Sequence, residues 1–304
     1  MMRSRVPGRA PGGLPLRIFS RASCVSVCTG AALLACANAS AAPAEEADPT
    51  ELPRWEWGLG VGVVHAPAYL GSSVQRTHVA PLPYFVYRGE RLRANREGVG
   101  LGLIDTDNLR LDLSLNGALP VKSSGTAREG MRDLPPIIEF GPALKYRLIR
   151  ENGRYWGLHW PIRHAVGVDR HGMEQAGWIS DPTLRIIEPM HIGGVRVDFG
   201  LDVGVKFQSA TFNNYYYQVR DSEATAARPA YRTGAGYAGT TISTGLLARF
   251  DQIVAGAFVG TAQLQGARFI DSPLVERKQN FFGGVALFWV FQKSPEMVPQ
   301  DLMR

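Results

Sequence analysis

Apolar and polar residues alternate along most of the chain that follows residue 55. Between 109 and 116, leucine occupies every odd position, and Arg110, Asp112, Ser114 and Asn116 occupy the even positions. Between 195 and 208, seven apolar residues alternate with polar residues or glycine without a break. This period of two predicts strands that have one apolar and one polar face. The second run is longer than most strands of globular proteins.

The same alternation recurs in 138–148, 156–162, 242–248 and 285–291, and no comparable stretch has a sustained helical period. Two folds fit this pattern: a soluble sandwich with a dry apolar core, or a transmembrane barrel whose apolar faces contact lipid. Strand lengths of about 9 to 11 residues and aromatic residues near the strand ends favour the barrel. These aromatic residues are Trp55, Trp57, Trp156, Trp289 and Phe291. We therefore predict an all-β, transmembrane, antiparallel up-and-down β-barrel.

The lengths of the connections predict the number of strands, because transmembrane barrels have short turns on one side and long loops on the other. Long connections are expected at 66–78, 119–136, 167–177, 209–236 and 265–278, and short ones at 88–90, 105–107, 150–154, 189–193 and 250–252. The alternation holds if a turn at Asn95–Gly98 divides the segment between 90 and 105. This gives twelve strands, the third and fourth unusually short, with both termini periplasmic. Ten strands is the alternative.

Basic charge and cysteine are concentrated near the N-terminus. Residues 1–41 contain five arginines, no acidic residue, a short apolar run and an A-x-A site at 39–41, which is typical of a secretory signal peptide. Removing them leaves 28 basic against 27 acidic residues, so the basic pI does not indicate a nucleic-acid partner. Cys24, Cys28 and Cys36 lie in this segment, so we expect no disulfides or thiolate metal sites afterwards. The alternative is a lipoprotein signal with lipidation at Cys36.

The remaining chain divides by composition and pattern. Residues 42–54 are acidic and proline-rich and are expected to form a flexible periplasmic leader. Residues 55–291 contain the alternating segments and are expected to form the barrel. Residues 292–304 follow the last aromatic residue of the pattern and are expected to form a periplasmic tail.

Several segments together resemble the MipA/OmpV family of Gram-negative outer-membrane proteins, the MltA-interacting protein family. They are GLGVGVVHAPAYLGS (58–72), PLPYFVYRGERLRAN (81–95), TAREGMRDLPPIIEFGPALKYRL (126–148), PAYRTGAGY (229–237) and DSPLV (271–275). The chain departs from the family at GSSV, where an acidic residue is absent, and in its tail after Phe291. The resemblance implies a barrel in the cell outer membrane, in contact with outer-membrane lipid.

For function, the resemblance implies two different roles and no agreed catalytic residues. One is a scaffold that links a murein hydrolase to a murein synthase in the periplasm, and this is the role we expect. The alternative is a narrow porin-like channel for small solutes.

The sequence offers little catalytic chemistry, so we expect no enzyme activity, no cofactor and no metal. It contains no G-x-S-x-G nucleophile motif. His159 and His164 are five residues apart on one predicted strand, so they face opposite sides and cannot bind one ion. A Ser-His-acid site assembled on the barrel rim from distant residues stays open.

Charged residues on the polar faces are the stronger feature, and we expect them to line the lumen. They are Arg110, Asp112, Glu139, Lys145, Arg147, Arg163, Arg196, Asp198, Asp202 and Lys206. In one interpretation, opposite charges pair across strands and fill a narrow barrel, because an unpaired buried charge is costly. In the other, they line a water channel and bias its ion selectivity. We favour mostly paired charges and at most a narrow pore.

Two further segments suggest how the barrel is filled. Gly58, Gly60 and Gly62 share the predicted inner face of the first strand and would leave room for bulky lumen side chains or a loop. Tyr215, Tyr216 and Tyr217 lie in the longest predicted outer loop. They predict an aromatic girdle or a loop folded into the mouth, or else a surface for contact with a partner.

Overall fold

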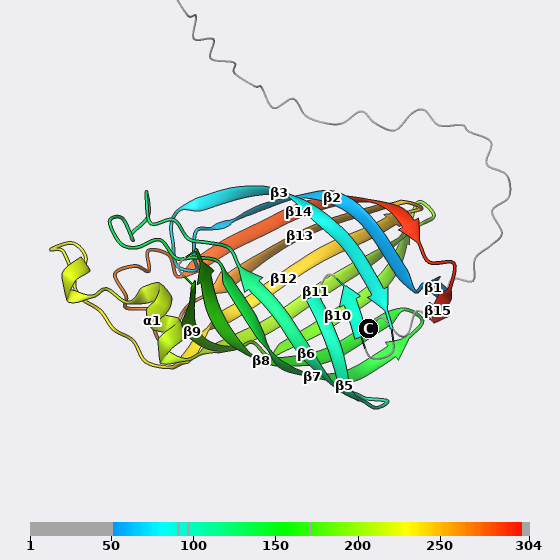
Figure 1. The fold of residues 1–304 in the computed structure, drawn as a ribbon, viewed down its shortest axis with the longest axis horizontal. Coiled ribbons are helices and arrows are strands. Elements are labelled where there is room, and N and C mark those ends of the chain that lie inside the picture. The colour runs from blue at the N-terminus through cyan, green and yellow to red at the C-terminus, as the bar shows by residue number, and fades with distance from the viewer. Residues whose placement is uncertain (1–50, 90–91, 96–97, 171, 300–304) are drawn as a thin grey trace, which may run out of the picture. The chain divides into compact units, whose positions relative to one another are not determined.

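A computed structural model describes residues 51–89, 92–95, 98–170 and 172–299. The signal-peptide and lipidation predictions therefore lie outside the described residues, as do most of the leader and the end of the tail. In the described part of the chain, no helix is long and apolar enough to cross a membrane. The structure consists mainly of antiparallel strands (Figure 1).

The elements have the following bounds. They are β1 (Glu51–Pro53), β2 (Trp55–Pro67), β3 (Gln75–Arg88), β4 (Leu92–Asn95), β5 (Gly98–Asp105), β6 (Leu109–Ala118), β7 (Ile137–Glu151), β8 (Arg154–Asp169), β9 (Gly172–Ser180), β10 (Thr183–Ile192), β11 (Val195–Gln208), α1 (Ala210–Tyr217), a 3-10 helix (Asp221–Glu223), β12 (Gly236–Phe250), β13 (Ile253–Gln263), β14 (Gln279–Lys293) and β15 (Met297–Pro299).

The strands from β2 to β14 form one sheet that closes on itself. Consecutive strands pair as hairpins, and β14 pairs with β2, which joins the two ends of the strand series. β8 pairs with both β9 and β10, and β11 also pairs with both. β9 and β10 are therefore two halves of one interrupted strand. The thirteen strand segments fill twelve positions in the wall, and the predicted up-and-down barrel is confirmed.

The interruption lies between Ser180 and Thr183. On β8, the ladder passes from His159, opposite Thr183, to Ile162, opposite Ser180. The residues left between them include prolines on both strands, Pro161 and Pro182, and proline has no backbone N–H to donate to a ladder. The wall therefore has a local break in its hydrogen bonding at this point.

The turn predicted between 90 and 105 is also present. β4 and β5 pair antiparallel, with Asn95 opposite Gly98, so the chain reverses within the NREG sequence. β4 has four residues and β5 has eight, which confirms that these two strands are short. One predicted connection differs: β8 continues to Asp169 and β9 begins at Gly172, so the 167–177 loop is a short hairpin. Residues 172–175 are all exposed and lack the alternation that would have identified the strand.

The burial of side chains alternates along β7 and β8 as the sequence pattern predicts, and it is less regular along β10 and β12. In β7, Ile137, Glu139 and Arg147 are buried, whereas Ile138 and Phe140 are each 45% exposed. Because the sheet is closed, the buried face is the inside of the barrel and the exposed apolar face is the outside. Most polar residues of the wall therefore point inward and most apolar residues outward, which is the reverse of a soluble protein.

The glycines of β2 face inward and accommodate large neighbours. A side chain at Gly60 would collide with the ring of Phe288, and one at Gly62 would collide with Leu82. A side chain at Gly58 would collide with the backbone of β14. The predicted space inside this strand is thus occupied by bulky side chains of the neighbouring strands.

The two ends of the barrel differ. At one end, called here the turn end, consecutive strands are joined by short turns, such as those at Gly153 and Gly193–Gly194, where positive φ angles favour glycine. At the other, called here the loop end, long connections carry α1 (Figure 1). β1 and β15 pair antiparallel in a separate two-stranded sheet at the turn end, with Leu52 opposite Val298. The sequence pattern did not predict this pairing of leader and tail.

Candidate functional site: the charged interior and its loop cap

Charged side chains inside the barrel form groups that link neighbouring strands. In the first group, Asp112 of β6 accepts from the Nε atom of Arg110, two residues away on the same strand face. The Nζ atom of Lys145, on β7, lies 3.3 Å from the other carboxylate oxygen of Asp112. Arg110 and Asp112 are each only 3% exposed. Two cations thus share one buried carboxylate.

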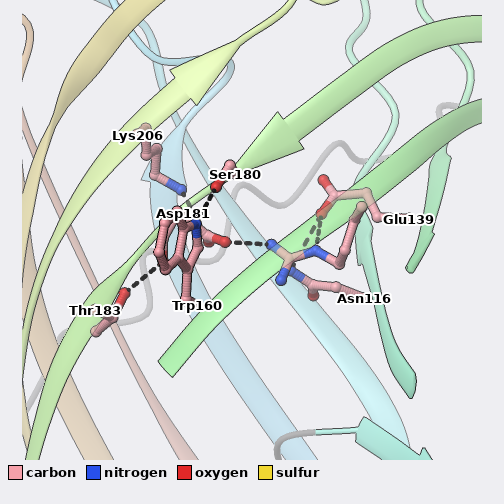
Figure 2. A network of polar contacts seen from close by, with 8 residues as sticks. Asn116, Glu139, Trp160, Ser180, Asp181, Thr183 and Lys206 are labelled. Carbon is pink, nitrogen blue, oxygen red and sulfur yellow. Dashed lines mark hydrogen bonds and ion pairs between the residues drawn. The ribbon is translucent and has the colours of Figure 1, made fainter. Parts of the chain in front are cut away.

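The second group is centred on Arg163 of β8. Figure 2 labels Glu139, Asp181, Asn116 and Lys206, which belong to this group. The Nε atom of Arg163 donates to Glu139 at 2.9 Å, and its terminal nitrogen donates to Asp181 at 2.8 Å. Lys206 of β11 lies 3.9 Å from the second oxygen of Asp181, and the amide of Asn116 donates to Glu139 at 3.5 Å. The group therefore spans the wall from β6 to β11.

The break between β9 and β10 positions Asp181 in this group. The residue lies between the two strand halves, and its backbone carbonyl accepts from the hydroxyl of Thr183 at 2.9 Å. Asp181 is on the inner face by the alternation of both halves, because Ile179 lies opposite Arg163 and Thr183 lies opposite His159, and its carboxylate therefore reaches Arg163. On the outer face, the indole of Trp160 donates to the Ser180 hydroxyl at 3.1 Å beside the same break.

A third group lies on β10 and β11. The guanidinium of Arg185 donates to both carboxylate oxygens of Asp202, at 2.8 and 2.9 Å, in the fork geometry that arginine favours. Arg196 pairs with Asp198 at 3.3 Å on the same strand.

A fourth group closes the interior at the turn end. Glu56 of β2 is 3% exposed and accepts from Tyr84 at 2.8 Å and from Arg249 at 3.1 Å. Its carboxylate is also 3.2 Å from the guanidinium of Arg88, which is fully buried. Arg88 in turn donates to the carbonyl of Pro53 in β1. The terminal segments are thereby tied to the barrel interior.

All ten residues predicted to line the lumen lie on β6, β7, β8 and β11. Nine of them form ion pairs within the described part of the chain. The guanidinium of Arg147 donates to the carbonyl of Thr106 at the turn end. The geometry agrees with the interpretation that most of the charges are paired. That these residues line a channel stays a prediction. The interior is not dry throughout: the side chains of Lys145, Asp202 and Arg196 are 25%, 32% and 31% exposed.

Sequence reasoning missed Asp181, Arg185, Arg88 and Arg249 as members of these groups. The Asp181–Pro182 dipeptide was a usable signal, because proline interrupts a strand and the preceding residue leaves the ladder. Arg185 lies in a segment whose alternation is weak, so its face could not be assigned from the pattern.

The long loops meet at the loop end in an apolar cluster, called here the loop cap. It consists of Tyr69, Val121, Leu134, Tyr217, Ala238, Leu264, Ala267 and Phe269, all buried. The rings of Tyr217 and Phe269 stack at 3.7 Å, and the hydroxyl of Tyr217 donates to the carbonyl of Leu70 at 2.9 Å. The loop that contains the three tyrosines is therefore folded into the mouth of the barrel through α1. This is one of the arrangements that the sequence predicted.

Burial changes the acid–base properties of the loop cap. It raises the pKa of Tyr69 to about 12, and the Tyr69 hydroxyl donates to the carbonyl of Leu274. Burial also raises the pKa of Tyr217 well above its ordinary value. Both phenols are therefore neutral hydrogen-bond donors at physiological pH, and the loop cap is uncharged at its centre.

The described residues contain no cluster of three or more histidine, cysteine or acidic side chains arranged to hold a metal ion. His159 faces inward and shares a 2.7 Å hydrogen bond with the hydroxyl of Tyr155. His164 faces outward, where its ring meets the edge of Phe140. The two histidines thus lie on opposite faces, as their spacing predicts.

Comparison with known proteins identifies the family. A family model described as MltA-interacting protein MipA matches residues 59–291. The chain is 29% identical over 243 residues to the outer membrane protein Omp26La of Vibrio anguillarum, which covers 78% of this chain and 87% of that protein. Two similar solved structures are a bacterial polysaccharide outer membrane secretin and the NanC porin. Their TM-scores are 0.39 and 0.37 and their identities 9% and 11%; the matches cover 78% and 76% of this chain and 99% and 98% of theirs. The chain therefore belongs to the MltA-interacting protein MipA family and is a β-barrel protein of the cell outer membrane.

Proposed function

We propose that this protein is a non-enzymatic scaffold that anchors murein enzymes, a hydrolase and a synthase, at the periplasmic side of the outer membrane. The observation that carries the proposal is the interior filled with paired charges. Charges such as Arg163, Glu139 and Asp181 are paired across strands, and the loop cap covers the mouth. A barrel filled in this way is better suited to hold a surface in place than to pass solutes.

The turn end supplies the surface for such a partner. In an outer-membrane barrel the short turns face the periplasm, so β1 and β15 lie on that side. Arg54 and Glu296 join the two terminal segments through an exposed pair at 2.6 Å. Arg88 holds β1 from the interior. The family is named for interaction with MltA, which agrees with a protein partner.

Affinity capture from envelope extracts tests the proposal. The full mature chain should retain a murein hydrolase and a murein synthase well above an unrelated outer-membrane barrel of similar size. A variant with Arg54→Glu and Glu296→Ala, which removes the exposed pair, should retain less of both. A matched variant at the loop end, Arg277→Glu, should retain as much as the unmodified chain. Equal recovery of these enzymes on the unrelated barrel would contradict the proposal.

A narrow channel is the second candidate function, because several interior charges are partly exposed. Arg196, Asp202 and Lys145 each keep a quarter to a third of their side chains accessible, which requires water beside them. If this water is continuous, the purified barrel in a planar bilayer should show discrete conductance whose ion selectivity changes in Arg196→Ala or Arg110→Ala. A correctly folded barrel that stays silent would remove this candidate.

A further inference from the structure

A pocket at the loop end has a strongly basic lining. Its volume is about 280 Å³, and it lies between the 119–136 loop, the start of β9, α1 and the segment after α1. Four arginines line it, Arg128, Arg132, Arg220 and Arg232, against two acidic residues, Glu174 and Glu223. The formal charge of the lining is therefore +2. An anion would be attracted to such a concave surface.

The acidic residues of the pocket are already engaged. Glu174 pairs with Arg132 at 2.7 Å, and Glu223 accepts from the backbone N–H of Arg220 at 3.2 Å. Arg232 and Arg220 are exposed at the rim. Neither acidic side chain therefore neutralises the whole set of arginines.

Arg128 lies at the floor of the pocket and has the most unusual surroundings of the four arginines. It is 3% exposed, and its guanidinium donates to the carbonyls of Tyr216 at 2.5 Å and Arg132 at 3.3 Å. Within the part of the chain that the structure describes, its Nε atom has no hydrogen-bond partner, and no carboxylate pairs with it. A buried cation held only by carbonyl groups retains unused capacity to bind an anion.

Tyr215 gives a second, independent indication of a missing partner. Its ring lines the same pocket, and its hydroxyl is buried without a hydrogen-bond partner among the described residues. A buried hydroxyl without a partner costs stability, so such groups are rare in folded proteins. The hydroxyl lies next to Gly167 of β8, so a ligand in the pocket would reach it only if the ring turned toward the pocket.

We propose that this pocket binds a small organic anion of monosaccharide size that carries a phosphate or a carboxylate group. The volume is close to the lower limit of about 300 Å³ for small-molecule sites. Arginines bind phosphate and carboxylate through paired N–H donors, and Gln175 and Gln218 in the lining offer amides to sugar hydroxyls. Because the loop end of an outer-membrane barrel faces outward, the anion is a soluble sugar derivative or the phosphorylated sugar of an outer-leaflet glycolipid. The proposal does not depend on the scaffold function or on conductance.

Binding measurements on the full mature barrel in lipid nanodiscs test the proposal. The probes are glucose 6-phosphate, glucuronate and uncharged glucose. Calorimetry measures the affinity of the barrel for each probe. We expect both anions to bind and glucose to bind at least tenfold more weakly, as the loss of charge-assisted hydrogen bonds implies. Nanodiscs that contain a phosphorylated glycolipid or its dephosphorylated form distinguish the two sources. If the glycolipid is the ligand, only the phosphorylated form should compete with glucose 6-phosphate.

Variants at the exposed rim avoid the risk that a floor substitution prevents folding. Arg220→Gln combined with Arg232→Gln should weaken anion binding about tenfold or more. Arg277→Gln, an exposed arginine in a different loop and outside the pocket lining, is the matched control and should leave binding unchanged. Absence of anion binding in the unmodified barrel would overturn the proposal. So would equal affinity for glucose, or an equal loss in the Arg277→Gln control.

Discussion

The barrel interior and the loop cap fill neighbouring spaces in opposite ways. Inside the wall, Arg163 is surrounded by Glu139 and Asp181, and almost every buried charge has an opposite charge beside it. In the loop cap, Tyr217 stacks on Phe269 in an apolar cluster. The difference follows from what lies outside each region.

In the wall, lipid takes the apolar face of each strand, so the polar face must be satisfied inside. The backbone hydrogen bonds already hold every strand in register. Charged side chains on adjacent strands can therefore pair without the loss of conformational entropy that ordering a loop requires. The loops have no such ladder. They have to be ordered against their conformational entropy, and burial of apolar area is the interaction that supplies enough free energy.

The largest effect is expected when an interior charge loses its partner. In Arg163→Leu, the described residues leave Glu139 with a 3.5 Å contact with Asn116 and leave Asp181 with Lys206. An unpaired buried charge costs about 3–5 kcal/mol, so the urea midpoint of the refolded barrel should fall strongly. The double change Arg163→Leu with Glu139→Leu should recover part of the loss. A loss below about 1 kcal/mol in the single variant would show that water already screens the group.

The loop cap should yield a smaller and more local effect. Tyr217→Ala removes the ring that stacks on Phe269 and the hydroxyl that donates to Leu70. Truncation of a buried aromatic residue costs about 3 kcal/mol. We expect faster protease cleavage within 209–236 and 264–278, while the unfolding midpoint of the strands stays nearly unchanged. A global loss of strand stability would mean that the cap and the wall unfold as one unit.

Alkaline pH should separate the two regions. Burial raises the pKa values of Tyr69 and Tyr215 to about 12, from an ordinary value of 10.0. Folding therefore favours the neutral phenols. Their contribution to stability is complete below pH 10 and is lost as the pH rises from 10 through 12. Cleavage of the loops should increase over this range, in parallel with tyrosinate absorbance, while the strand signal in circular dichroism persists. Ionisation of both tyrosines near pH 10 would contradict this expectation.

The smallest effect is expected where the two regions meet. The hydroxyl of Ser209 accepts from the N–H of Phe212 in α1 and from the N–H of Trp178 in β9, each at 3.1 Å. Ser209→Ala removes this N-cap and should cost about 1 kcal/mol. Hydrogen exchange should quicken in α1 and not in β12 or β13. Ser209→Asp, which retains an acceptor, serves as the control and should restore most of the protection.

The wall was predictable from residues that are close in sequence. In β7, the alternation of Ile138, Glu139 and Phe140 determines which side chains face inward, because successive residues of a strand point to opposite faces. The turn at Asn95–Gly98 was predictable from turn residues and from the parity of the connections. The pairing of Glu139 with Arg163 follows once the faces are known, since the two strands are joined by a short turn.

The rest depends on contacts between distant residues. Asp181 contacts Arg163 from the break between β9 and β10, which the alternation of neighbouring residues did not reveal. Tyr69 and Phe269 meet in the loop cap although 200 residues separate them. No local pattern encodes such contacts, because loop side chains have no fixed period and their partners are set by how the closed wall brings the loops together.

The sequence by itself determined the class of fold, the inward and outward faces of most strands and the compartment, because a period of two and a lipid-facing surface leave few alternatives. Only the tertiary structure decided how the barrel is filled. It joins leader to tail through β1 and β15, folds α1 into the mouth and sets Arg128 at the floor of a basic pocket. These arrangements follow from closure of the sheet, which places segments from opposite ends of the chain within reach of each other.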